Sequence, residues 1–146
     1  MNIFRLLKPK ATVAYIKKNN TIRQGIEKMQ VHGYSAIPVI DDNGEYIGTV
    51  SEGDFLRFIL ENRGHDPSVA ESNHVIQIVN EERNQPVRVD TTMKELLLRV
   101  MDQNFVPVTD DRNIFIGIVT RRDVIKYYYD KYNIDKSAAD QGSEEK

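Results

Sequence analysis

The chain has 146 residues, with 20 Lys plus Arg against 22 Asp plus Glu, so its formal net charge is −2. Hydrophobic residues make up 40% and charged residues 29%, as in a soluble globular domain, and the near-neutral balance argues against a dedicated nucleic-acid binder. The absence of cysteine excludes disulfides and thiolate chemistry, and no apolar run approaches the ~18 residues of a membrane span, so we expect a cytoplasmic protein.

The first 20 residues carry five cations and no acid, a local charge of +5. The cations are Arg5, Lys8, Lys10, Lys17 and Lys18. Two interpretations stay open for the basic segment at residues 1–10. It is either a solvated arm or a basic lip beside an anion site.

Hydrophobic periodicity and turn residues predict the elements that follow. The first half contains an extended run over residues 12–16, a helix over 22–32, strands over 36–40 and 46–50, and a helix over 53–62. Thr21 is predicted to cap the first helix, and Gly33 to end it in the left-handed conformation. Asn43 and Gly44 favour a tight turn between the two strands.

The second half repeats this order after a linker over residues 64–85. Within this linker we expect a short helix over 74–79. The next elements are an extended run over 86–89, a helix capped by Thr91 or Thr92, strands over 105–109 and 114–119, and a helix over 122–132. Asn104 is predicted to end its helix as Gly33 does. Residues 134–146 show no apolar periodicity, so we expect a disordered acidic tail.

An internal duplication explains the shared order. Residues 38–54 align with residues 107–123 at an offset of 69, and 8 of these 17 positions are identical. Each half has the order β-α-β-β-α, over residues 11–63 and 86–133, and buries too little surface to be stable alone. We therefore predict an α+β fold in which two halves, related by a pseudo-two-fold axis, pack through their sheets.

The duplicated residues resemble the tandem CBS (cystathionine β-synthase-type) domain, or Bateman module, which senses adenine nucleotides. The resemblance covers about residues 10–132. Its motifs are GYSAIPV at 33–39, IGTVSEGD at 47–54 and IGIVTRRD at 116–123. More narrowly, the chain resembles small stand-alone CBS-pair proteins of Gram-positive bacteria, one group of which binds cyclic di-AMP. The features that match are VAYI at 13–16, NFVPV at 104–108 and VTRR at 119–122.

Asp54 and Asp123 depart from that cyclic di-AMP group, and are typical of CBS modules that hold the ribose of AMP, ADP or ATP. The resemblance implies a non-catalytic regulatory module whose ligand is cyclic di-AMP or one of these mononucleotides. It also implies a homodimer that signals to a separate, unknown partner protein. The alternatives are a nucleotide-free structural dimerisation module and a nucleotide-processing enzyme.

Two Ser/Thr-x-x-Asp pairs stand where a strand runs into a helix: Ser51 with Asp54, and Thr120 with Asp123. Such a pair can simply cap its helix, because the hydroxyl accepts a free backbone N–H and the acid favours the positive helix end. The same geometry suits a nucleotide. Free N–H groups and the hydroxyl would bind a phosphate, and the carboxylate would accept both hydrogens of a ribose diol.

Arg121 and Arg122 stand in the first turn of the last helix, where cations oppose the helix dipole by about 0.3–1 kcal/mol each. A bound phosphate would reverse that sign through charge-assisted hydrogen bonds. The equivalent residues of the first half are Glu52 and Gly53. We therefore expect the phosphate mainly at the second half. Two solvated arginines remain the alternative.

An adenine ring needs an apolar slot with backbone polar groups at its edge. By resemblance, Ala14 and Ile16 line the base, and Ala36 or Ile37 offers backbone to its edge. The remaining candidates for the slot lie in the same segments and in the second half: Thr12, Tyr34, Ser35, Pro38, Phe105, Val106 and Pro107. Catalysis and metal binding find no support, since His32, His65 and His74 lack metal-ligand spacing.

Overall fold

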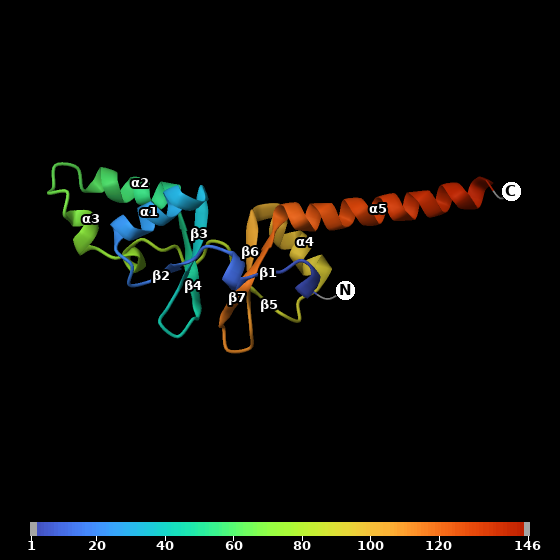
Figure 1. The fold of residues 1–146 in the computed structure, drawn as a ribbon, viewed down its shortest axis with the longest axis horizontal. Helices are drawn as coiled ribbons and strands as arrows, with labels where there is room; N and C mark the ends of the chain where they lie inside the picture. Colours follow the sequence, from blue (N-terminus) through green and yellow to red (C-terminus); the bar gives the residue numbers. More distant parts are fainter. Residues whose placement is uncertain (1–2, 145–146) are drawn as a thin grey trace.

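The computed structural model describes residues 3–144, and its elements follow the duplicated order (Figure 1). The first half contains β2 (Ile16–Lys17), α1 (Ile22–His32), β3 (Ala36–Ile40), β4 (Tyr46–Ser51) and α2 (Glu52–Glu61). The linker contains α3 (Val69–Ser72) and a 3-10 turn, η3 (Val75–Gln77). The second half contains β5 (Val87–Arg88), α4 (Met93–Asp102), β6 (Phe105–Thr109), β7 (Phe115–Thr120) and α5 (Arg121–Glu144).

Local hydrogen bonds explain where the helices begin and end. Thr21 and Gln24 form a reciprocal capping box at the start of α1, and Gly33 ends that helix with φ 66°. Thr92 caps α4, because its hydroxyl accepts from the backbone N–H of Glu95 at 3.1 Å. These three predictions are confirmed. The prediction for Asn104 is wrong, because α4 ends at Gln103 in an extended conformation with φ −120°.

The strands form two sheets of the same plan within residues 3–144. One has the order β2-β3-β4, and the other has the order β1-β7-β6-β5, where β1 (Lys8–Pro9) is an added edge strand. In each sheet a short parallel strand and a longer antiparallel strand flank a central strand. The duplicated sequence therefore produces a duplicated sheet.

The two sheets meet at their hairpins. The N–H of Tyr46 donates to the carbonyl of Asn113 at 3.0 Å, and the N–H of Phe115 donates to the carbonyl of Gly44 at 2.9 Å. Tyr46 is the duplicate of Phe115, and Gly44 is the duplicate of Asn113, so the two hydrogen bonds are equivalent. Ile40, Tyr46 and Phe115 pack beneath this seam as a small shared core. The seam gives the two halves their pseudo-two-fold relation and confirms the predicted α+β architecture.

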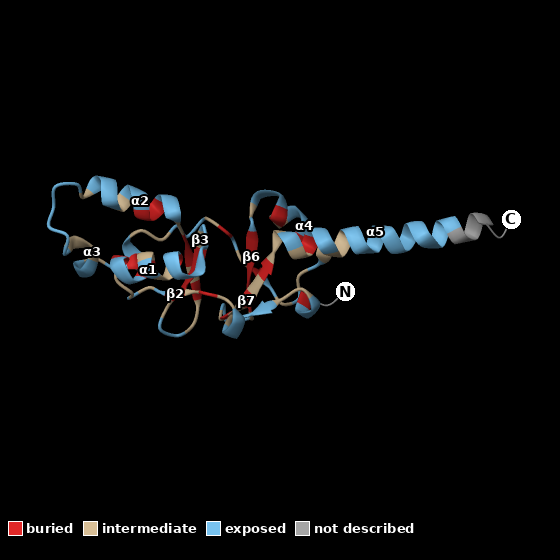
Figure 2. Ribbon diagram, turned by 45° about the horizontal axis from the view of Figure 1, so that its top comes forward, coloured by how far each residue is buried: buried red, intermediate tan, exposed pale blue. Residues whose placement is uncertain are grey.

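Each half also has a core of its own, visible as the buried segments in Figure 2. Ile16, Ile37 and Val50 lie in the first core, and Leu96, Val106 and Val119 lie in the second. Helices cover one face of each sheet, which leaves the opposite faces to meet at the seam (Figure 1).

The N-terminal segment is part of the second half. Ile3 is only 2% exposed and packs into that half's core, while Lys8 and Pro9 pair with β7 as β1. The interpretation of this segment as a solvated arm is therefore wrong for residues 3–10. Residues 1–2 lie outside the described residues. Anchoring by apolar residues and backbone pairing fixes where its basic side chains lie.

The end of the chain differs from the prediction of a disordered tail over residues 134–146. α5 continues to Glu144 and extends away from the body of the molecule (Figure 1), with residues 129–140 exposed. The helix is already nucleated by its packed first turns, so adding residues to it avoids the unfavourable nucleation step. Residues 145–146 lie outside the described residues. Among the helices that the structure describes, none is long and apolar enough to cross a membrane.

Candidate functional site

A cavity of about 160 Å³ lies between the two halves. Its walls come from the segment that precedes β2, the start of β3, the start of β6 and the end of β7. The lining residues are Val13, Ala14, Tyr34, Ser35, Ala36, Pro38, Asn104, Phe105, Ile118 and Thr120. This volume is below the roughly 300–1,000 Å³ of pockets that enclose a drug-sized ligand, so the cavity suits a flat ring whose substituents remain at its mouth.

Thr120 joins the cavity to the first turn of α5. Its hydroxyl accepts from the backbone N–H of Asp123 at 3.2 Å, as in a helix cap. The Asp123 carboxylate forms a long ion pair with the ammonium of Lys8 at 3.9 Å, and its side chain is 30% exposed. Asp123 therefore keeps carboxylate surface that a further hydrogen-bond donor can reach.

A second hollow of about 390 Å³ adjoins Asp123. Arg5, Lys8 and Lys126 line it together with Asp123 and Asp130, which gives three cations against two anions. The N-terminal segment thus brings two of its cations, Arg5 and Lys8, to the last helix. Of the two interpretations of that segment, the basic lip fits this placement.

The two arginines at the start of α5 differ in their contacts. The Nε of Arg121 donates to the backbone carbonyl of Val100 at 2.7 Å, which satisfies an acceptor near the end of α4. Arg122 is exposed on the first turn. Of the two, only Arg122 is therefore free of this packing role.

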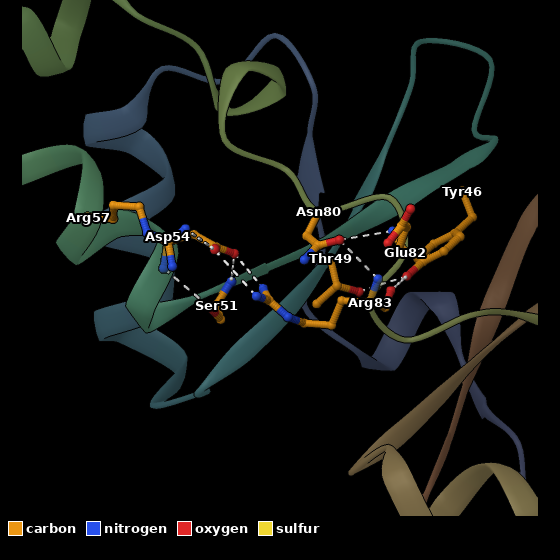
Figure 3. Close-up of polar contacts among 8 residues, drawn as sticks. All are labelled: Tyr46, Thr49, Ser51, Asp54, Arg57, Asn80, Glu82 and Arg83. Carbon is orange, nitrogen blue, oxygen red and sulfur yellow. Dashed lines mark hydrogen bonds and ion pairs between the residues drawn. The ribbon is translucent and has the colours of Figure 1, made fainter. Parts of the chain in front are cut away.

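The equivalent site of the first half is closed (Figure 3). Ser51 and Asp54 form a full capping box at the start of α2, with the Ser51 N–H 2.9 Å from the Asp54 carboxylate. Arg83 from the linker pairs with the same carboxylate at 2.5 Å, and Arg57 lies 3.6 Å away. The Asp54 side chain is only 5% exposed, and these partners surround it.

Burial and hydrogen bonding oppose each other at Asp54. Burial alone would raise the pKa of the Asp54 carboxyl, but the hydrogen bonds from Arg83 and from the Ser51 backbone lower it, and the net pKa lies below its ordinary value. Asp54 is therefore held as a paired carboxylate near neutral pH.

The hollow outside Asp54 has the opposite charge to the one outside Asp123. Its volume is about 530 Å³, and its charged lining is Asp54, Glu61, Glu81 and Glu82 against Arg57, a net charge of −3. The hollow beside Asp123 has a net charge of +1. An anionic group is therefore favoured at the second half.

The structure brings together seven of the candidate residues around the cavity: Ala14, Tyr34, Ser35, Ala36, Pro38, Phe105 and Thr120. Four others are buried strand residues outside its lining: Ile16, Ile37, Val106 and Pro107. Thr12 is exposed, and its hydroxyl donates to the carbonyl of Pro9 at 2.8 Å.

Sequence reasoning missed Val13, Asn104 and Ile118 as lining residues. The duplication held a signal for one of them, because Asn104 aligns with Ser35, a residue already expected in the slot. Ile118 faces the cavity because it alternates with the buried Gly117 and Val119 along β7. Among residues 3–144, the structure shows no cluster of His, Asp and Glu that would hold a metal ion.

Comparison with known proteins assigns both halves to one family. The model of the CBS domain matches residues 8–61 and again residues 73–130. A crystal structure of CbpB in complex with c-di-AMP superposes with a TM-score of 0.84 at 23% identity, covering 94% of this chain and 91% of that one. CBSX2 in complex with AMP gives a TM-score of 0.70 at 22% identity, covering 90% and 98%. These two likenesses show the fold.

A protein of Geobacillus kaustophilus also superposes, with a TM-score of 0.79 at 27% identity, covering 90% of this chain and 98% of that one. Among curated sequences, an L-aspartate semialdehyde sulfurtransferase of Methanosarcina acetivorans is 24% identical over 82% of this chain. The chain spans only 23% of that enzyme, and less than half of the other curated relatives it matches.

Proposed function

Because the chain belongs to the CBS domain family, we propose that it is a non-catalytic regulatory module that binds an adenine nucleotide between its two halves. The observation that carries this proposal is the cavity that opens beside Thr120 and Asp123. It combines an apolar slot of ring size with a helix start, an accessible carboxylate and a basic rim.

In this proposal the adenine ring enters between Ala14 and Phe105. Its edge meets polar groups of Ser35 and Ala36, which line the same cavity. The Asp123 carboxylate accepts hydrogen bonds from the free ribose hydroxyls, which are two in a mononucleotide and only the 2′-hydroxyl in cyclic di-AMP.

The phosphate belongs beside the basic residues of the second half. The Thr120 hydroxyl and the start of α5 offer hydrogen-bond donors, while Arg5, Lys8 and Lys126 supply positive charge next to Asp123. Arg122 is exposed on the same turn and can approach an anion from outside. Arg121 contributes indirectly, by holding the end of α4 through Val100.

The ligand we favour is cyclic di-AMP, with AMP, ADP or ATP as the next candidates. Structural neighbours of the same fold include CbpB in complex with c-di-AMP and CBSX2 in complex with AMP. The accessible carboxylate of Asp123 supports a mononucleotide, whose ribose hydroxyls are free. The small cavity supports cyclic di-AMP, because one adenine can enter it while the rest of the ligand stays outside.

We further propose that the chain forms a homodimer and signals to a separate protein in the cytoplasm. Leu56 and Leu60 on α2, and their duplicates Ile125 and Tyr129 on α5, are large apolar side chains left exposed. A ligand that binds one relative orientation of the halves more tightly would shift the population of a partner-binding surface. Sedimentation velocity checks the dimer, and a monomer at every concentration contradicts it.

Isothermal titration of the purified protein with cyclic di-AMP, AMP and ATP tests the proposal. We expect heat from at least one ligand, and Asp123→Ala and Arg122→Met to weaken binding of a charged nucleotide at least tenfold. Glu52→Ala, in the first turn of α2 at the position that duplicates Arg121, is the control in the first half and leaves affinity unchanged. A folded protein that gives no heat at millimolar nucleotide supports the structural dimerisation alternative instead. Turnover of a nucleotide that Asp123→Ala abolishes supports an enzyme.

A further inference from the structure

The duplicated fold contains a second position for a ligand, and linker residues fill it. Ile16 pairs with Val39 in the first sheet, and Val87 pairs with Val108 in the second, so Ile16 and Val87 are equivalent. Counting back from these residues, Thr12 and Val13 correspond to Arg83 and Asn84. Val13 lines the open second-half cavity and Thr12 is exposed outside its lining, whereas the polar side chains of Arg83 and Asn84 lie at the duplicate position.

Arg83 occupies the acceptor atoms of the first-half aspartate. Its guanidinium lies 2.5 Å from one carboxylate oxygen of Asp54 and 3.4 Å from the other (Figure 3). A sugar diol at this helix start would need the same two oxygens. A guanidinium that donates to both of them is therefore a direct competitor.

Asn84 fills the inner part of the same position. Asn84 is 6% exposed, and its side-chain amide donates to the carbonyl of Phe105 at 2.9 Å. Its own carbonyl accepts from the hydroxyl of Tyr46 at 2.8 Å, and its φ of 53° is left-handed, a conformation that asparagine tolerates. At the open cavity the duplicate positions are Val13 and Ala36, and the Val13 side chain has no amide that could donate to a carbonyl there.

The linker that carries these residues is anchored along its length. Thr49 and Asn80 exchange backbone hydrogen bonds at 3.2 and 3.1 Å, as an isolated bridge beside β4. A Cβ at Gly48 would come within 2.7 Å of the Asn80 carbonyl oxygen, so the close approach depends on glycine. The Arg83 and Asn84 side chains are thus held in place by backbone contacts as well as by their own bonds.

We propose that Arg83 and Asn84 act as an internal stopper that occupies the first-half site, so that each chain binds nucleotide only beside Asp123. This inference rests on the proposed function, because it concerns the duplicate of the same site.

Isothermal titration with AMP, which carries a single adenine, tests the stopper through the binding stoichiometry. We expect the wild-type chain to bind about one AMP. The variant Arg83→Thr/Asn84→Gly removes both side chains, and glycine keeps the left-handed φ at position 84. We expect this variant to bind about two AMP per chain, and about one when Asp123→Ala is added. Arg57→Ala is the matched control: it removes the exposed partner of Asp54, leaves Arg83 seated, and keeps the stoichiometry at one.

The outcomes separate the stopper from the proposed function. A wild-type chain that binds two AMP, or a folded double variant that still binds one, overturns the stopper. A wild-type chain that binds none, beside a double variant that binds one, overturns the second-half site and supports the stopper. If neither binds, both proposals are overturned. Should circular dichroism show that the double variant is unfolded, Arg83→Ser, which retains Asn84, is judged by the same outcomes.

Discussion

Tyr46→Phe removes one oxygen atom from the point where the first half, the linker and the seam meet. The Tyr46 hydroxyl lies 2.7 Å from the Thr49 hydroxyl and 2.8 Å from the Asn84 carbonyl, and all three residues are buried. Burial raises the pKa of the Tyr46 phenol well above its ordinary value, so the hydroxyl keeps its proton. Phenylalanine fills nearly the same volume but can neither donate nor accept.

The expected loss of stability follows from these two contacts. A neutral hydrogen bond contributes about 1 kcal/mol net, and a buried polar atom left without a partner costs about 1–3 kcal/mol. The Thr49 hydroxyl can rotate and water can reach the Asn84 carbonyl only in part, so we expect about 2 kcal/mol in total. For a domain of this size, each kcal/mol lowers Tm by about 3–4 °C, which gives a fall of about 7 °C.

Urea unfolding followed by circular dichroism measures this loss as a lower midpoint at an unchanged slope. Tyr129→Phe is the matched control, because Tyr129 is 64% exposed in the chain. That variant is expected to stay within about 0.5 kcal/mol of the wild type. If Tyr46→Phe loses no more than Tyr129→Phe, the Tyr46 hydroxyl does not hold the linker and the reasoning fails.

Three further predictions concern stability. The stability that Asp54 provides is present above about pH 4 and is lost as pH falls through its lowered pKa, so the destabilisation by Arg83→Gln should be smaller at about pH 3 than at about pH 6. Thermal unfolding across that range checks it, and a pH-independent difference argues against the ion pair. Thr21→Ala deletes the cap of α1 and should cost about 1 kcal/mol in urea unfolding, whereas no loss would make the capping box irrelevant. Gly117→Ala would drive a Cβ into the Lys8 carbonyl, so limited proteolysis should remove the N-terminal segment faster than in wild type; equal rates contradict this.

The sequence predicted the local parts of the fold because their causes are local. The capping residue Thr21, the left-handed Gly33 and the alternation of the strands act over a few residues, and the offset of 69 ties the halves together. The prediction that Asn104 ends its helix in the left-handed conformation was wrong, because the chain enters β6 directly in an extended conformation. The prediction of a disordered tail beyond residue 133 was wrong because composition alone does not reveal that a helix has already been nucleated.

The candidate site was predictable only in part, since its wall is made by segments that meet in space. Ser35, Ala36 and Thr120 lie in duplicated motifs, so the repeat pointed to them. Arg83 and Asn84 lie in the linker, outside the region of identity, and only strand pairing shows which residues they replace. The sequence predicted the unequal charge of the two helix starts, but the filling of the first-half position by linker residues was visible only in the structure.

The helix α5 is long relative to the half that carries it. With 24 residues and a rise of 1.5 Å per residue, it measures about 36 Å, and only its first turns pack against the second half. A rotation of that half by about 10° at the seam would move the end of this rod by about 6 Å. The geometry is that of a lever, with the hairpin contacts as its fulcrum and Glu144 near its tip. A small change of angle between the halves is thereby magnified into a displacement large enough for another molecule to detect.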